Sequence, residues 1–235
     1  MRICDLTTLY IDGGQGGVNT YLLEKARYLS ERADTSHLII VPGARDEKRE
    51  VFGSTLYTVK RRSLPSNPGH RVLASFRAVR EILKAEAPGL VEVDCAYMLG
   101  QVARRALGAH VPVIGFYHVH LPTFIARPRF SRLGFLASTA EHFAWRYVDY
   151  CKQFCDRLVV TSPDMHTRLS KAGFGRLDTV ALGVNLDLFR PAASRESSPD
   201  THVLSVGRLS REKDLSTLIK AIKLLPEHYR LTIVG

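Results

Sequence analysis

Short apolar runs alternate with stretches of helical periodicity along most of the chain. The runs are brief and rich in Val, Ile and Leu, which is typical of strands buried on both faces of a parallel sheet. The stretches between them place apolar side chains three or four residues apart, which indicates amphipathic helices. Repeated strand-helix-strand units predict an α/β fold, a Rossmann-like parallel sheet with helices on both faces. We expect strands at 2–6, 37–41, 56–59, 90–93, 111–118, 157–162 and 178–182, and helices after residue 17, over 71–87 and over 101–107.

The apolar rhythm stops at RPAASRESSPDTH, residues 190–202, where proline, alanine and serine dominate as in interdomain linkers. It restarts as one β-α-β unit with VLSVG, a helical stretch and YRLTIVG. We therefore expect an N-terminal domain over 1–190, a linker over 191–202 and the start of a second domain over 203–235. A two-stranded parallel unit cannot bury both of its faces, so we expect this chain to be a fragment that lacks most of the second domain.

Composition indicates the class of protein, its cellular compartment and the state of its cysteines. The 235 residues are 45% hydrophobic and 24% charged, as in ordinary globular proteins. No run of eighteen apolar residues occurs, and MRICDLTTLY lacks an apolar signal core, so we expect a cytoplasmic protein without a membrane span. The four cysteines have no second Cys or His pair at zinc-binding spacing, which favours reduced thiols and no metal site.

Positive charge is concentrated in the middle of the chain. The net charge is +10, and residues 51–150 hold 13 Lys and Arg against 6 Asp and Glu. Two interpretations stay open: a solvated basic face, or attraction to an anionic membrane surface, which would make the protein peripheral on the inner face of the membrane. No helix-turn-helix, zinc-finger or ribonucleoprotein pattern accompanies the charge, so we expect no nucleic-acid partner.

Four glycines in five positions precede the first helix, in GGQGGVNTYLLEKARYL. Such a cluster indicates either a tight strand-to-helix turn or an anion site, because a helix N-terminus offers unpaired N–H groups and a partial positive charge. Gly16 and Gly17 are the two glycines nearest the helix.

Two further stretches carry candidate chemistry. GFYHVHLPTF places His118 at the carboxyl end of a predicted parallel strand, where open α/β sheets bind ligands, although a histidine there can also simply cap the strand or pack in the core. SVGRLSREKDLSTLI places Arg208 and Lys213 between a strand and a helix. They are either ordinary surface charges or a metal-free clamp for a diphosphate.

Five motifs in order resemble one family over essentially the whole chain. These are GGVNTYLLEKARYL, FYHVHLP, VTSPDMHTRLSKAGF, ALGVNLDLFRP and SVGRLSREKDLSTLIKAI. They resemble the GT-B glycosyltransferases of family four, which use nucleotide sugars and retain anomeric configuration, and among them mannosyltransferases and sulfoquinovosyltransferase-like members. The resemblance implies that Gly16 and Gly17 approach the donor phosphate and that His118 contacts the transferred sugar. It also implies that Arg208 and Lys213 bind the diphosphate of a donor such as GDP-mannose or a UDP-sugar, and that a lipid or glycan is the acceptor.

One departure concerns the family's later acidic motif, two glutamates that hold the donor ribose and sugar, which would lie beyond Gly235. We expect this chain by itself to bind donor weakly and to transfer no sugar. No Asp-x-Asp occurs, and EVD at 92–94 is its nearest imitation, so a metal-independent mechanism is expected. The alternatives are a nucleotide-sugar epimerase or hydrolase on the same fold, and a noncatalytic domain that binds an anionic surface.

Overall fold

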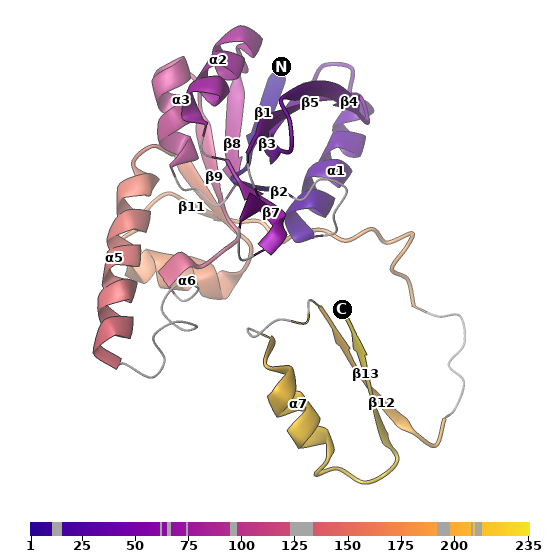
Figure 1. Cartoon of the computed structure of the whole chain (residues 1–235). Coiled ribbons are helices and arrows are strands. Elements are labelled where there is room, and N and C mark those ends of the chain that lie inside the picture. Colours follow the sequence, from indigo (N-terminus) through magenta and orange to yellow (C-terminus); the bar gives the residue numbers. More distant parts are fainter. Residues whose placement is uncertain are drawn as a thin grey trace.

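The computed structural model describes residues 1–10, 16–61, 63–64, 67–73, 75–94, 98–122, 134–191, 198–207, 209 and 213–235. Within them, an eight-stranded sheet forms the centre of the larger part of the molecule (Figure 1). Its order is β11-β10-β9-β8-β1-β3-β5-β4. All neighbouring strands are parallel except β4 and β5, which are antiparallel. The strands are β1 (Arg2–Leu6), β3 (Ser36–Gly43), β4 (Glu47–Val51), β5 (Ser54–Lys60), β8 (Leu90–Asp94), β9 (Val113–Tyr117), β10 (Arg157–Val160) and β11 (Leu177–Thr179).

Helices cover both faces of this sheet, because successive side chains of a strand point to opposite sides. Leu38 and Ile40 of β3 pack in one core cluster, to which α2 (Phe76–Glu86) and α3 (Leu99–Leu107) contribute buried residues. Ile39 and Val41, between and beyond them, pack in a second cluster with α1 (Gly17–Ser30). This two-sided, mostly parallel arrangement confirms the predicted fold class.

Two further helices, α5 (Gly134–Lys152) and α6 (Pro163–Lys171), pack with β9 and β10 in a third cluster that includes Tyr117, Leu158 and Leu169. The start of α6 is fixed locally. The Ser162 hydroxyl accepts a hydrogen bond from the Met165 N–H at 3.2 Å, and proline occupies the first helical position, where its missing N–H costs nothing.

A small antiparallel sheet corrects one expected boundary. It joins β2 (Leu9–Tyr10), β7 (Asn67–Val72) and β6 (Ser63–Leu64). The helix expected over 71–87 therefore begins only at Phe76, because Arg71 and Val72 pair with β2. That pairing joins segments about sixty residues apart, and local periodicity carries no sign of it.

The predicted β-α-β unit is observed as β12 (Thr201–Val206), α7 (Leu215–Ile222) and β13 (Tyr229–Val234). Its strands are parallel and in register from Thr201 opposite Tyr229 to Val206 opposite Val234. No residue of α7 is buried. The division into domains over 1–190 and 203–235 with a linker over 191–202 stays a prediction, and residues 192–197 lie outside the described part.

Candidate functional site

His118 lies directly after β9, at the edge of the sheet where the parallel strands end. Its ring stacks on Phe116, with centroids 4.9 Å apart and planes 15° apart. It also lies 5.8 Å from the ring of Tyr21, which sits one turn into α1. His118 is thus held between its own strand and the beginning of α1, the element that the glycine stretch precedes.

Asp94 is the last residue of β8, the strand that pairs with β9, and its side chain lies against His118. Its Oδ1 lies 3.1 Å from His118 Nε2, and its Oδ2 accepts a hydrogen bond from the Thr7 hydroxyl at 2.7 Å. The side chains of His118 and Asp94 are only 9% and 7% exposed. His118 Nε2 is buried and has no hydrogen-bond partner among the described residues, so the two side chains are in contact without a hydrogen bond between them. The sequence pattern pointed to His118 but not to this pair.

The signal for Asp94 was present in the chain order. An acid ends the strand that precedes the histidine strand, and consecutive parallel strands bring their carboxyl ends together. From the sequence, EVD at 92–94 resembles only the metal-binding Asp-x-Asp motif. In the described part of the chain, no group of three His, Cys, Asp or Glu side chains is arranged to hold a metal ion.

The fold gives no steric reason for glycine at the start of α1. Gly16 is extended, with φ 170° and ψ 150°, a conformation that any residue adopts. A Cβ added at Gly16 or Gly17 would meet no atom within 4 Å. Gly16, the N-cap, provides no side-chain cap, and the first turn carries no acid. Gly13 and Gly14 lie outside the described residues, so the choice between a tight turn and an anion site stays a prediction.

Beneath α1, charged side chains add to the apolar contacts that this helix makes with the sheet. Lys25 Nζ lies 2.9 Å from Asp5 of β1 and 2.7 Å from Glu92 of β8. The Tyr21 hydroxyl donates to Glu92 at 3.1 Å. Burial alone would lower the pKa of Lys25, but the two carboxylates raise it above its usual value, so the ammonium stays charged. This cluster fixes α1 over the centre of the sheet.

Asp5 has a second partner. Its Oδ2 lies 2.5 Å from His37 Nε2, and His37 Nδ1 lies 2.8 Å from the Ser54 hydroxyl. Burial would raise the pKa of Asp5, but the charge of Lys25 and the His37 hydrogen bond lower it below its usual value. The acid-histidine-hydroxyl order resembles a hydrolytic triad. Ser54 is completely buried, so no substrate reaches it and the arrangement is structural.

His120 is partly buried and packs against neighbouring aromatic side chains. β9 ends at Tyr117, so the alternation of a strand does not continue to residue 120. His120 Nδ1 lies 3.1 Å from the Tyr117 hydroxyl, and its ring meets Trp145 edge-on at 5.2 Å. Burial, reinforced by the charge of Arg168, lowers its pKa. His120 therefore supports the segment that follows β9.

Of the two predicted diphosphate ligands, Lys213 is described and Arg208 lies outside the described residues. The Lys213 side chain lies over the end of β12, where a Cβ on Gly207 would meet its Cε at 3.4 Å. No other described residue forms an ion pair with Lys213. Asp214 follows with a left-handed backbone, φ 45°, and its carboxylate accepts hydrogen bonds from the hydroxyls of Ser216 and Thr217. Lys213 thus stands at the carboxyl end of a parallel strand.

The sequence profile described as Glycosyltransferase Family 4 matches residues 15–188, which contain the glycine end of α1, Asp94 and His118. The chain belongs to glycosyltransferase family 4. This family 4 chain is 24% identical over 249 residues to Sulfoquinovosyl transferase SQD2 of Arabidopsis thaliana. The alignment covers 96% of the chain and 44% of that relative, so the chain spans less than half the length of the curated relative it matches.

Solved structures share the fold of this family 4 chain. Sucrose-phosphate synthase from Thermosynechococcus elongatus matches with a TM-score of 0.69 at 18% identity, over 100% of this chain and 62% of that one. The lipopolysaccharide outer core galactosyltransferase WaaB in its apo form matches with a TM-score of 0.59 at 16% identity, over 99% and 60%. These likenesses support a GT-B glycosyltransferase fold. Among its described helices, none has the length and apolar character needed to cross a membrane.

Proposed function

We propose that the protein transfers a sugar from a nucleotide-diphosphate-sugar donor to a lipid or saccharide acceptor with retention of configuration. The observation that supports this most is the buried His118–Asp94 pair. His118 lies against Tyr21, which is one turn from the glycine end of α1. Membership of family 4 and the resemblance to GT-B structures agree with it. GDP-mannose and UDP-sugars are the proposed donors.

In this proposal the donor diphosphate meets the N–H groups at Gly16 and Gly17 and the cations Arg208 and Lys213. A helix N-terminus favours negative charge, and charge-assisted hydrogen bonds from Arg and Lys favour the charge that develops on the leaving phosphate. His118 contacts the transferred sugar, and Asp94 lies against its imidazole. The acceptor hydroxyl then attacks the face that the nucleotide leaves, and a departing phosphate oxygen takes the hydroxyl proton, so the proposed step uses no metal.

The test is transfer by the complete protein as its gene encodes it. Incubation with single nucleotide sugars and a mixture of lipid and oligosaccharide acceptors should give a glycosylated product from one donor, and NMR should show that the anomeric configuration is retained. An epimerase would convert the nucleotide sugar without any acceptor. An inverted product would contradict the retaining mechanism, and no product from any donor would contradict the proposed function.

Replacing His118 by Ala separates a role in the site from a role in the core. We expect turnover to fall about tenfold or more, because a hydrogen bond to the sugar is lost, while the melting temperature changes little. His142→Ala, at an exposed histidine of α5, is the matched control and should keep full turnover. Equal losses of turnover and thermal stability in His118→Ala would instead assign His118 to packing.

A further inference from the structure

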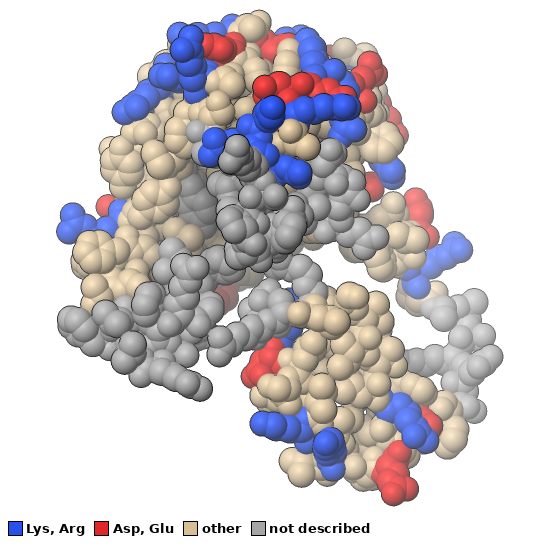
Figure 2. Space-filling view, viewed as in Figure 1, with Lys and Arg blue, Asp and Glu red and all other residues tan. Residues whose placement is uncertain are grey.

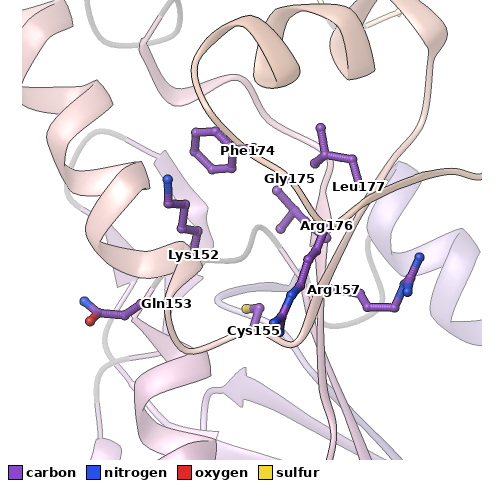
Figure 3. Close-up of a pocket in the computed structure, with 9 residues that line it drawn as sticks. Lys152, Gln153, Cys155, Arg157, Phe174, Gly175, Arg176 and Leu177 are labelled. Carbon is purple, nitrogen blue, oxygen red and sulfur yellow. The ribbon is translucent and has the colours of Figure 1, made fainter.

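A cavity of about 250 Å³ opens where the chain leaves α5 and enters β10 and β11 (Figure 3). Arg157 and Leu177, the first residues of these two strands, line it. It therefore lies at the amino ends of parallel strands, whereas His118 follows the carboxyl end of β9. The cavity and the candidate sugar-transfer site occupy opposite edges of the sheet, so an occupant of the cavity would be a second ligand.

The inner wall of the cavity is apolar. Phe174 and Leu158 line it and are only 6% and 5% exposed. The Lys152 ammonium lies 4.5 Å from the centroid of the Phe174 ring, so this ring already accepts a cation against its face. Ligand pockets for drug-sized molecules measure roughly 300–1,000 Å³. At about 250 Å³, this cavity suits a compound of about one ring and is too small for a whole nucleotide sugar.

Three cationic residues, Lys152, Arg157 and Arg176, also line the cavity, and the Arg157 side chain extends away from Phe174 (Figure 3). Two of them are already paired with acids: Lys152 Nζ lies 2.5 Å from Asp149, and Arg157 binds both oxygens of Asp178 at 2.5 and 2.7 Å.

Arg176 differs from the other two cations. It is exposed, and no other described residue forms an ion pair with it. Asp156, the nearby acid of the same edge, instead accepts hydrogen bonds from Arg104 and from the Val113 N–H, both at 2.7 Å. The charge of Arg176 helps to lower the pKa of Asp156, so this acid lies within electrostatic reach, but the Arg176 guanidinium forms no ion pair with a described residue. A guanidinium presents paired N–H donors that match two oxygens of a phosphate or carboxylate.

We propose that this cavity binds a small phosphate monoester that carries a single ring. The phosphate is held by Arg176, and the ring lies against the apolar wall that Leu158 and Phe174 form. A phosphate monoester offers several oxygens to the paired N–H donors of this guanidinium and carries a charge of about −1.5 to −2 at pH 7, so it gains more from the one cation without an ion pair than a singly charged carboxylate does. The proposal is independent of sugar transfer, because it concerns another edge of the sheet and its test measures binding alone.

The experiment is an NMR titration of the ¹⁵N-labelled 235-residue chain with phenyl phosphate as the probe. Benzoate, inorganic phosphate and benzyl alcohol are titrated separately, so that charge and ring are tested one at a time. We expect saturable shifts of the amides of residues 174–177, with phenyl phosphate binding more tightly than each of the other three. Equal binding of inorganic phosphate would remove the ring from the proposal, and equal binding of benzyl alcohol would remove the anion; either result overturns it.

Variants locate the charge that matters. Arg176→Gln should weaken phenyl phosphate binding about tenfold or more, since a charge-assisted bond is lost, and Lys152→Gln should weaken it less, because Lys152 already shares its charge with Asp149. Arg80→Gln, at an exposed arginine of α2 that forms no ion pair with a described residue, is the control and should bind as the parent chain does. Unchanged affinity in Arg176→Gln, or shifts spread away from residues 174–177, would overturn the proposal.

Discussion

At the scale of single residues, Lys25 joins the glycine end of the first helix to the sheet. Its ammonium is the common partner of carboxylates on β1 and β8, and its side chain is only 14% exposed. A buried ion pair is weak evidence of net stabilisation, but removal of one partner is costly because the remaining charge stays buried. Lys25 therefore helps to hold α1, and with it Gly17 and Tyr21, alongside the apolar contacts of Leu22 and Ala26 with the sheet.

Replacing Lys25 by Met keeps the aliphatic stem and removes the charge. We expect the free energy of unfolding at pH 7 to fall by about 3–5 kcal/mol, as for other broken buried pairs. Urea denaturation followed by circular dichroism measures it. Lys84→Met, at an exposed lysine of α2, is the control and should change stability by no more than about 0.5 kcal/mol.

The same comparison at several pH values tests the cause. The pKa of Asp5 is lowered in the folded protein, so its contribution is fully present above the unfolded value of about 3.9 and is lost as pH falls through the folded value. Without Lys25, protonation of Asp5 relieves a buried charge. The stability difference between Lys25→Met and the parent chain should therefore narrow as pH falls toward 4, and a difference independent of pH would show that lost packing is the cause.

Some candidate residues can be predicted from a short stretch of sequence, and others only from contacts between separate elements. Gly16, Gly17 and His118 follow from short motifs and from the rule that parallel sheets bind ligands at their carboxyl ends. Asp94 follows from the chain order of the consecutive strands β8 and β9, whereas the Lys25 cluster depends on how α1 lies against β1 and β8. Contacts between strands far apart in the chain leave no periodic trace in the sequence.

At the scale of elements, the beginning of α1 offers a direct test of the anion site. Gly17→Val adds a side chain where no atom lies within 4 Å, so the fold should accept it. If the backbone there meets a donor phosphate, the new side chain should weaken nucleotide-sugar binding about tenfold or more.

Calorimetric titration of the complete protein with the nucleotide sugar measures this effect. Gly183→Val is the matched control, because an added Cβ there also meets no atom within 4 Å. If Gly17→Val binds the donor as well as Gly183→Val does, the phosphate contact at Gly17 is wrong and the bare helix end has another explanation.

Elements with a regular apolar pattern were predictable, and elements without one were not. The expected strands at 2–6, 37–41, 56–59, 90–93 and 157–162 all correspond to strands of the main sheet, because strands covered on both faces are apolar throughout. β4 reads EKREV and was missed, since it is an antiparallel edge strand with no fully buried residue. No helix was predicted specifically over 134–152, where α5 exposes aromatic residues such as Phe143, at 65%, and so blurs the helical period.

At the scale of the whole molecule, basic side chains gather over the region where Figure 1 places α2 and α3, at the upper left of Figure 2. Exposed cations of these helices include Arg77, Arg80, Lys84 and Arg105. Acidic residues are mixed among them, and Arg77 is paired with Glu81. These residues supply part of the excess of positive charge in residues 51–150, and Arg127, Arg129 and Arg132 of the same excess lie outside the described residues.

We expect this basic face to draw the protein to anionic membranes. At low ionic strength it should sediment with vesicles that contain anionic lipid and not with neutral vesicles, because each basic residue near such a surface contributes about 1 kcal/mol, and salt should weaken the binding. The double variant Arg80→Glu, Lys84→Glu should sediment less. The same charge change on the β-α-β unit, Lys220→Glu with Lys223→Glu, is the control, and equal sedimentation with both vesicle types would contradict the prediction.

The place of β1 has a consequence for how the chain acquires its structure during synthesis. β1 is made first and stands inside the sheet, with β3, β5 and β4 following on one side in the order β3-β5-β4, and β8, β9, β10 and β11 following on the other in chain order. On the second side, each new strand can pair with the outermost strand already formed as soon as it leaves the ribosome. On the first side, β5 is made after β3 and β4 and pairs between them, in parallel with β3 and through a short hairpin with β4. Nascent chains should therefore gain protease resistance stepwise from the β1–β3 pair outward, since β5, between β3 and β4, is the one strand of this sheet that enters between two strands made before it.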